Sequence, residues 1–223
     1  MVKINIKDKL HIGCGLNFQE DWINLDGSWN AWFAKYSYLR KLLRIFRLAP
    51  NLDVEWSPDI IIHKVLRPLP FPNNSMRVVY TSHLLEHLYL DEARALLREC
   101  WRVLKFGGVL RIMVPDLENM ASQYVNDIKN KNENVALLAD LFIKSLGFRD
   151  THSPRGGIIY RIYSSLKDFH THKWMYDKNS LAYYMEQAGF QDVKKMQRYK
   201  SRIENIEKIE QNNGLCVEGI KRI

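Results

Sequence analysis

Short apolar runs alternate with longer amphipathic segments along most of the chain. The runs end at turn-forming residues, a pattern typical of buried strands in an α/β fold. We expect strands at residues 10–12, 22–25, 58–65, 76–82, 109–115, 191–199 and 214–223. Apolar residues recur at helical spacing in other segments, which predicts helices at residues 90–106, 117–130, 133–146 and 177–188.

The helices expected at 90–106 and 177–188 end before Gly107 and Gly189, and the segment 201–213 reads as a polar helix or loop. Strands that alternate with helices predict a mostly parallel sheet covered on both faces. The sequence has no internal repeat, low-complexity segment or linker. We therefore expect one domain over residues 1–223, with 29–56 and 147–177 as lid or substrate-facing segments.

Residues 31–48 form a basic amphipathic pattern. At 100° per residue, one face carries leucine and phenylalanine and the opposite face carries arginine and lysine. Three interpretations stay open: contact with a membrane surface, a lid or core helix of the same molecule, and a dimer contact.

The chain has 223 residues, a formal net charge of +8 and a sequence pI near 9.3. This charge favours an anionic partner, which could be a nucleic acid, an anionic lipid surface or a phosphorylated small molecule. The three cysteines have no metal-type spacing, which predicts reduced thiols. No signal-peptide pattern or membrane span is seen, so we expect a cytoplasmic protein. The alternative is a cytoplasmic protein that also contacts a membrane surface peripherally.

A glycine turn follows the first expected strand. Residues 10–12 lead into Gly13-Cys14-Gly15, and the next strand ends on Asp26. Glycines let the backbone approach a nucleoside ligand, and an acid at this place accepts the ribose hydroxyls. Only the ten residues 16–25 separate Gly15 from Asp26, whereas a dinucleotide-binding fold needs about 20.

Five stretches together resemble the class I methyltransferases that use S-adenosylmethionine: "LHIGCG", "INLD", "LPFPNNSMRVVYTSHLLEHL", "LRECWRVLKFGGVLRIMVPD" and "LAYYMEQAGFQDV". The nearest likeness is to a branch of sugar- and glycan-modifying enzymes with a shortened first helix. The resemblance implies a Rossmann-like, doubly wound sheet of seven strands, mostly parallel with an antiparallel last strand. It also implies S-adenosylmethionine as the cofactor, which has no pyrophosphate and so needs no long phosphate-binding loop.

The resemblance carries over to individual positions. Gly13, Cys14 and Gly15 match the cofactor loop, and Asp26 matches the ribose-binding acid; its alternative role is a turn or helix-cap residue. Ser82 and His83 match the point after the fourth strand where the cofactor is touched.

The adenine site departs from the family pattern. Members commonly have an acid before the "LPF" connector, and Lys64 stands there in this chain. We expect backbone groups near Lys64 and Val65 to hold the adenine.

A hydroxyl acceptor needs a base to remove its proton, most often a histidine. If "SHLLEHL" is helical, His83, Glu86 and His87 share one face. His83 is then a candidate general base. Alternatively, the trio binds a divalent metal, because a similar segment of ubiquinone-pathway O-methyltransferases carries an acid, a glutamate and a histidine. A third interpretation has Glu86 capping backbone and His87 packing in the core. We expect no metal site.

A second histidine pair, His170 and His172, lies in "FHTHKWMYD", and Arg155 lies in an arginine-containing stretch before it. Both rings would face the same way on an extended segment. The two histidines either belong to a lid that faces the substrate or pack at the surface. Arg155 either binds an anionic substrate or is a solvated charge.

The leading hypothesis is an S-adenosylmethionine-dependent methyltransferase that methylates a hydroxyl of a small molecule. The expected acceptor is a sugar or glycan precursor, and a phosphorylated sugar is one form of it. The alternatives are a nucleic-acid methyltransferase and a regulatory protein that binds the cofactor without methylating. A nucleic acid is the less favoured partner, because the chain has no appended RNA-binding module and no motif for flipped-base amines.

Overall fold

The computed structural model describes residues 7–28, 31–32, 35–36, 56–57, 59–130, 135–148 and 171–223. Within this part of the chain, seven strands form one sheet in the order β3-β2-β1-β4-β5-β7-β6. The strands are β1 (Lys9–Ile12), β2 (Ile23–Asp26), β3 (Ile61–Ile62), β4 (Met76–Ser82), β5 (Leu104–Val114), β6 (Phe190–Met196) and β7 (Leu215–Lys221).

The first five strands run parallel to one another, and β7 is antiparallel to both of its neighbours, β5 and β6. The expected seven-stranded sheet with an antiparallel last strand is confirmed. Because β1 lies between β2 and β4, the loops after these strands meet at one edge of the sheet. Open α/β sheets bind their ligands at this carboxyl edge.

The central strands carry runs of buried apolar residues because both of their faces are covered. Leu10, Ile12, Val79, Leu110 and Ile112 are all fully buried. Such continuous apolar runs are typical of parallel strands between two layers.

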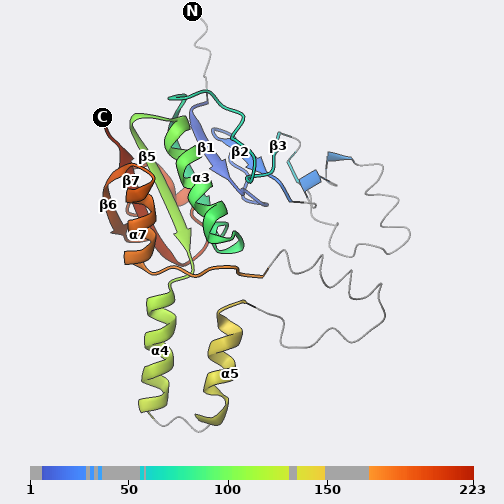
Figure 1. Ribbon diagram of the computed structural model, residues 1–223. Coiled ribbons are helices and arrows are strands. Elements are labelled where there is room, and N and C mark those ends of the chain that lie inside the picture. The colour runs from blue at the N-terminus through green and yellow to red at the C-terminus, as the bar shows by residue number, and fades with distance from the viewer. Residues whose placement is uncertain are drawn as a thin grey trace, which may run out of the picture.

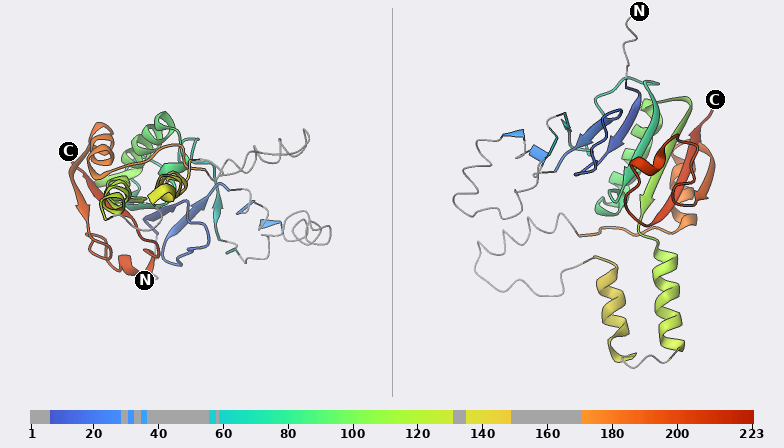
Figure 2. Two further views of the ribbon diagram at one scale, coloured as in Figure 1. Left: turned by 90° about the horizontal axis from the view of Figure 1, so that it is seen from below. Right: turned by 180° about the vertical axis from the view of Figure 1, so that it is seen from behind.

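Two helices cover one face of the sheet, α3 (Leu90–Val103) and α7 (Lys178–Gln187) (Figure 1). Helix α3 buries a stripe at spacings of three and four residues, consisting of Ala93, Leu96, Leu97, Cys100 and Val103. The opposite face is covered by the stretch that contains the 3₁₀ turn η3 (Ile206–Lys208), seen in front of the sheet in the rear view of Figure 2. The segment expected to be polar thus supplies three buried isoleucines, Ile203, Ile206 and Ile209.

Helices α4 (Leu117–Lys129) and α5 (Val135–Ser145) form a hairpin that extends below the carboxyl edge of the sheet in Figure 1. Tyr124 and Phe142 stack between them, with ring centroids 4.7 Å apart. Among the described residues, no helix is long and apolar enough to cross a bilayer.

The structure corrects two of the expected elements. Helix α3 ends at Val103 and passes directly into β5, so the glycines at 107–108 lie within the strand and do not cap the helix. Lys221 takes over part of the capping: its ammonium group donates to the carbonyl oxygens of Trp101 and Leu104 at 2.8 and 2.9 Å. The strand expected at 58–65 is only the two-residue edge strand β3, and Ile61 is exposed.

Candidate functional site

The loop after β1 is held by the end of β2. The backbone N–H groups of Gly13 and Cys14 both donate to the carbonyl oxygen of Leu25, at 2.8 and 3.2 Å. Gly13 and Gly15 have φ angles of +68° and +53°, in the left-handed region that favours glycine. A Cβ atom built on Gly15 would meet no atom within 4 Å, so open space lies beside this backbone.

Asp26, at the carboxyl end of β2, is buried and binds backbone on both sides. Its Oδ2 accepts from the N–H of Gly15 at 2.9 Å and its Oδ1 accepts from the N–H of Ser28 at 2.8 Å. Each carboxylate oxygen has a further lone pair, so ribose hydroxyls can still be accepted. The carboxylate therefore shapes the loop, in addition to the ribose-binding role expected from the sequence.

Cys14 lies between the two glycines, and its thiol contacts the carbonyl oxygen of Gly15. Its side chain is buried, and burial raises the pKa of the thiol to about 12, with a smaller contribution from the negative charge of Asp26. Cys14 can thus contribute backbone to the loop, and its thiol stays protonated and unreactive near neutral pH.

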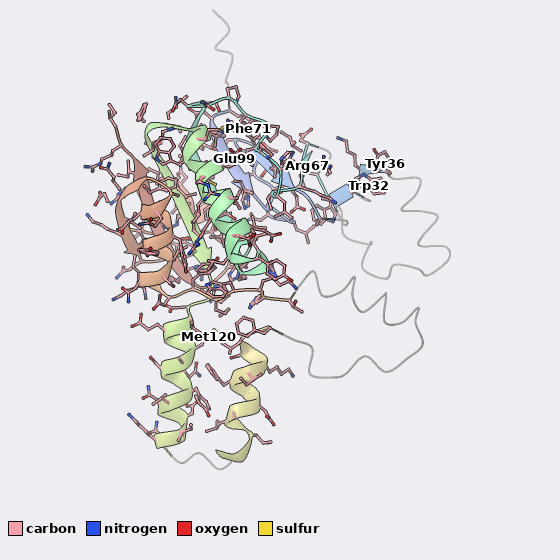
Figure 3. The ribbon with its side chains drawn as sticks, viewed as in Figure 1. Trp32, Tyr36, Arg67, Phe71, Glu99 and Met120 are labelled. Atoms are coloured by element: carbon pink, nitrogen blue, oxygen red, sulfur yellow. The ribbon has the colours of Figure 1, made fainter. Side chains whose placement is uncertain are left out.

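A cavity of about 270 Å³ adjoins the end of β2. Its lining comes from the turn after β2, the segment after β3 and one aromatic residue: Gly27, Ser28, Trp32, Ile62, His63, Lys64 and Arg67. Lys64, expected from the sequence at the adenine site, lines this cavity, whereas Val65 packs against the core. Figure 3 labels Trp32 and Arg67 on this side of the sheet.

The end of β4 carries the proposed base. His83 has a φ of +51°, and its ring lies between two acceptors. The Nδ1 atom is 3.0 Å from Oε1 of Glu86, and the Nε2 atom is 3.1 Å from the carbonyl oxygen of Asn213. The hydrogen bond to Glu86 raises the pKa of His83 above its usual value, although burial opposes this effect. Ser82, also predicted at this point, lies within 3.5 Å of the Asn212 side-chain amide.

The predicted helix over "SHLLEHL" is only the 3₁₀ turn η1 (Leu85–His87). As a result, His83 and Glu86 pair with each other, while His87 turns toward another part of the chain. Its ring lies 5.1 Å from the ring of His172. Glu86, His87 and His172 each place a ligand atom within 4.8 Å of the other two.

Several sequence-predicted residues lie outside the described part of the chain: His170, Arg155 and most of the segment 31–48. Conversely, three contributors were not predicted: Asn213, which contacts His83 across 130 residues of sequence, and Trp32 and Arg67 in the cavity. Trp32 lies in the segment 29–56, which was expected to face a ligand, so an aromatic residue there was a usable signal. A backbone carbonyl such as that of Asn213 has no sequence signal.

Residues 10–112 match a protein family described as "Methyltransferase domain". This range includes the glycine loop, Asp26, the cavity residues and His83. No curated protein sequence matches the chain at a significant level.

Solved structures with a related fold include three methyltransferases. A Thermotoga maritima protein described as a possible histamine N-methyltransferase is 16% identical, with a TM-score of 0.45, over 96% of this chain and 81% of that one. An S-adenosylmethionine-dependent methyltransferase from Archaeoglobus fulgidus is 15% identical, with a TM-score of 0.46, over 95% and 85%. Human N-acetylserotonin methyltransferase in complex with SAM is 14% identical, with a TM-score of 0.40, over 78% and 37%. These likenesses are too distant to inform the choice of acceptor.

Proposed function

We propose that this chain is an S-adenosylmethionine-dependent methyltransferase, which the match of residues 10–112 to a methyltransferase domain supports, and that it methylates a hydroxyl oxygen of a small-molecule acceptor. The oxygen target and the kind of acceptor go beyond this match. The pair formed by His83 and Glu86 at the carboxyl edge of the sheet is the observation that carries it.

The residues present fit the cofactor. Open space lies beside the Gly15 backbone, where the amino-acid part would approach, and the carboxylate of Asp26 keeps lone pairs for the ribose. The adjoining cavity, with Lys64 on its rim, has room for the adenine. When bound, S-adenosylmethionine supplies a methyl group on a sulfonium sulfur, which is already activated for displacement.

The protein's own contribution is orientation of the acceptor and removal of its proton. Glu86 is fully buried and faces Nδ1 of His83, so it fixes the ring and favours a proton on that nitrogen. The Asn213 carbonyl can only accept, so its contact needs a proton on Nε2; once that proton and that contact are lost, Nε2 can accept the proton of the acceptor hydroxyl. In this structure Nε2 faces the Asn213 carbonyl at the surface, and we propose that the acceptor hydroxyl takes the place of that contact.

A carboxylate, a histidine and a hydroxyl in this order form the usual arrangement by which enzymes activate an oxygen nucleophile. An amine acceptor with a free lone pair would not require such a base. We further propose a sugar or glycan precursor with an anionic group as the acceptor, because the net charge of +8 favours anions. The small-molecule acceptor is favoured over a nucleic acid.

The test separates cofactor binding from methyl transfer. Purified protein is incubated with S-adenosylmethionine and a panel of sugar phosphates, nucleoside-diphosphate sugars, simple phenols and short RNA, and methylated products are identified by mass spectrometry. His83→Gln should leave the dissociation constant of the cofactor nearly unchanged and lower turnover by about 10²–10⁴-fold, the usual contribution of a positioned base.

Asp26→Asn is the comparison variant for His83→Gln. It changes a side chain at the same carboxyl edge of the sheet, but one that we assign to the cofactor and not to the acceptor. It should weaken cofactor binding about tenfold or more, as loss of hydrogen bonds to a charged group predicts. Methylation of nitrogen only, methylation of RNA only, or unchanged turnover in a folded His83→Gln protein would each contradict the proposal.

A further inference from the structure

A second cluster shares Glu86 with the His83–Glu86 pair and adds two histidines that the proposed reaction does not use. It consists of Glu86 and His87 in η1 and His172 in the chain that precedes α7. This set differs from the trio expected from the sequence, because His172 takes the place of His83 and comes from a segment 85 residues further along the chain than His87.

Glu86 brings a buried oxygen that lacks a partner. Its side chain is fully buried, and only Oε1 is engaged by His83. The Oε2 atom has no hydrogen-bond partner among the described residues. A buried carboxylate oxygen left unpaired is costly, so such an atom indicates that a cationic or hydrogen-bonding ligand belongs beside it.

His172 is held in place by the end of α5. Its backbone N–H donates to the carbonyl oxygen of Gly147 at 2.9 Å, and Nδ1 lies 2.7 Å from the carbonyl oxygen of Leu146. A carbonyl can only accept, so Nδ1 carries the proton and Nε2 carries a lone pair. A Cβ atom on Gly147 would lie 2.6 Å from the ring, so a glycine is required at this position.

His87 has a similar orienting contact. Its Nδ1 lies 3.3 Å from the carbonyl oxygen of Thr171, next to His172 in the chain. The same stretch is tied to η1 by the N–H groups of Lys173 and Trp174, which both donate to the carbonyl oxygen of Glu86. Backbone carbonyls that orient histidine rings through Nδ1 are the usual outer contacts of metal-ligating histidines.

From this geometry we propose that Glu86, His87 and His172 bind one divalent first-row transition-metal ion. Two histidines and one carboxylate suit Zn²⁺, Fe²⁺ or Co²⁺, and three protein ligands leave at least one position open to water or another oxygen ligand. Ligand atoms of a tetrahedral ion with bonds of about 2.1 Å lie about 3.4 Å apart. The present spacing of up to 4.8 Å therefore closes with side-chain shifts on the order of 1 Å.

The experiment measures metal binding directly on the full-length, untagged protein after removal of ions with a chelator. Co²⁺ is added and its visible absorption is followed, and Zn²⁺ is titrated by calorimetry. The wild type should bind one ion per chain. Glu86→Gln and His172→Ala should each weaken binding by at least about 100-fold, since outer contacts of a metal site alone contribute 10–100-fold.

Two variants away from the cluster serve as matched controls. Glu204→Gln removes an exposed carboxylate near η3, and His63→Ala removes a histidine at the cavity after β3. Both should bind the ion like the wild type. Because Glu86 is buried, circular dichroism must show that Glu86→Gln is folded. His172, which is only half-buried, provides the second and safer variant.

Zn²⁺ should also raise the melting temperature of the wild type and leave that of His172→Ala unchanged. A wild type that binds no ion, or a folded variant of either ligand that binds as tightly as the wild type, would overturn the site. The cluster would then be a hydrogen-bonded contact between η1 and residues 171–174. Neither cofactor nor acceptor is present in these measurements, so their outcome is independent of the proposed O-methylation.

Discussion

Acidification should destabilise this protein through His11, a histidine in the middle of β1. Its side chain is almost completely buried against the rings of Trp22 and Tyr80, whose centroids lie 6.5 and 5.1 Å away. Burial lowers the pKa of His11 to about 3, and a backbone hydrogen bond with Asn17 opposes this only in part. The folded state therefore holds a neutral ring at every pH above about 3.

The direction of this pH effect follows from proton binding to His11 in the folded and unfolded states. Between pH 6.5 and about 3, the unfolded chain binds a proton at His11 and the folded chain does not, so the free energy of unfolding falls as the pH falls through this window. Each pH unit below 6.5 costs about 1.4 kcal/mol. At pH 5 the loss from this one residue is about 2 kcal/mol, and at pH 4 it is about 3 kcal/mol.

Urea unfolding followed by circular dichroism at pH 7.5 and pH 5 measures this loss, with His11→Phe as the comparison. Phenylalanine keeps an aromatic ring between Trp22 and Tyr80 but cannot bind a proton. The carboxylates of the protein titrate in both proteins, so their contribution cancels in the difference. The wild type should lose about 2 kcal/mol more than the variant on going to pH 5. An equal loss in the two proteins would refute the argument that burial holds His11 neutral.

Three further substitutions test the loop and the buried charges. Gly15→Val should abolish cofactor binding measured by calorimetry while costing only about 1–2 kcal/mol of stability, because the side chain enters open space at a positive φ; normal binding would show that the turn is only structural. Arg111→Met should cost about 3–5 kcal/mol in urea unfolding, because the buried carboxylates of Glu210 and Glu218, 2.6 and 2.7 Å from its guanidinium nitrogens, lose their buried positive charge; a loss below about 1 kcal/mol would contradict this. Lys221→Met should cost about 2–4 kcal/mol by removing the donor to the carbonyls at the end of α3, and Lys221→Arg should restore part of it; equal losses in both variants would assign the effect to packing.

The sheet was predictable because its signals are local. The runs that became β1, β4 and β5 contain consecutive apolar positions, the glycine turn follows β1, and Asp26 ends β2. The family resemblance supplied the antiparallel β7. The prediction was wrong at residues 104–108, where the glycines at 107–108 suggested the end of a helix but the chain is already in β5. The pairing of Met76 with Leu104 starts the strand earlier, and a lysine 117 residues away holds the carbonyl of Leu104.

The candidate site was predictable only in part, because half of its geometry depends on contacts between distant segments. Gly13, Gly15 and Asp26 lie within fourteen residues and have a recognisable spacing. The environment of His83 depends on the carbonyl of Asn213, and the partner of His87 is His172. The helical spacing of "SHLLEHL" grouped His83 with His87, but the turn is 3₁₀ and separates them. A short histidine-containing segment does not specify which side chains meet.

Asp26 explains how the loop keeps its shape without a long first helix. In dinucleotide-binding folds the glycine turn opens a helix, whose first turn fixes the backbone. Here the amides of Gly13 and Cys14 are held by the Leu25 carbonyl, and the amide of Gly15 is held by the Asp26 carboxylate. The end of β2 thus provides the acceptors that order the loop, and it does so before any ligand binds. Replacing Asp26 by asparagine removes the charge of the proposed ribose acceptor and leaves one oxygen for two backbone amides, those of Gly15 and Ser28. For this reason Asp26→Asn should weaken cofactor binding more than the loss of a single ribose contact would, and the stability of the free protein should fall with it.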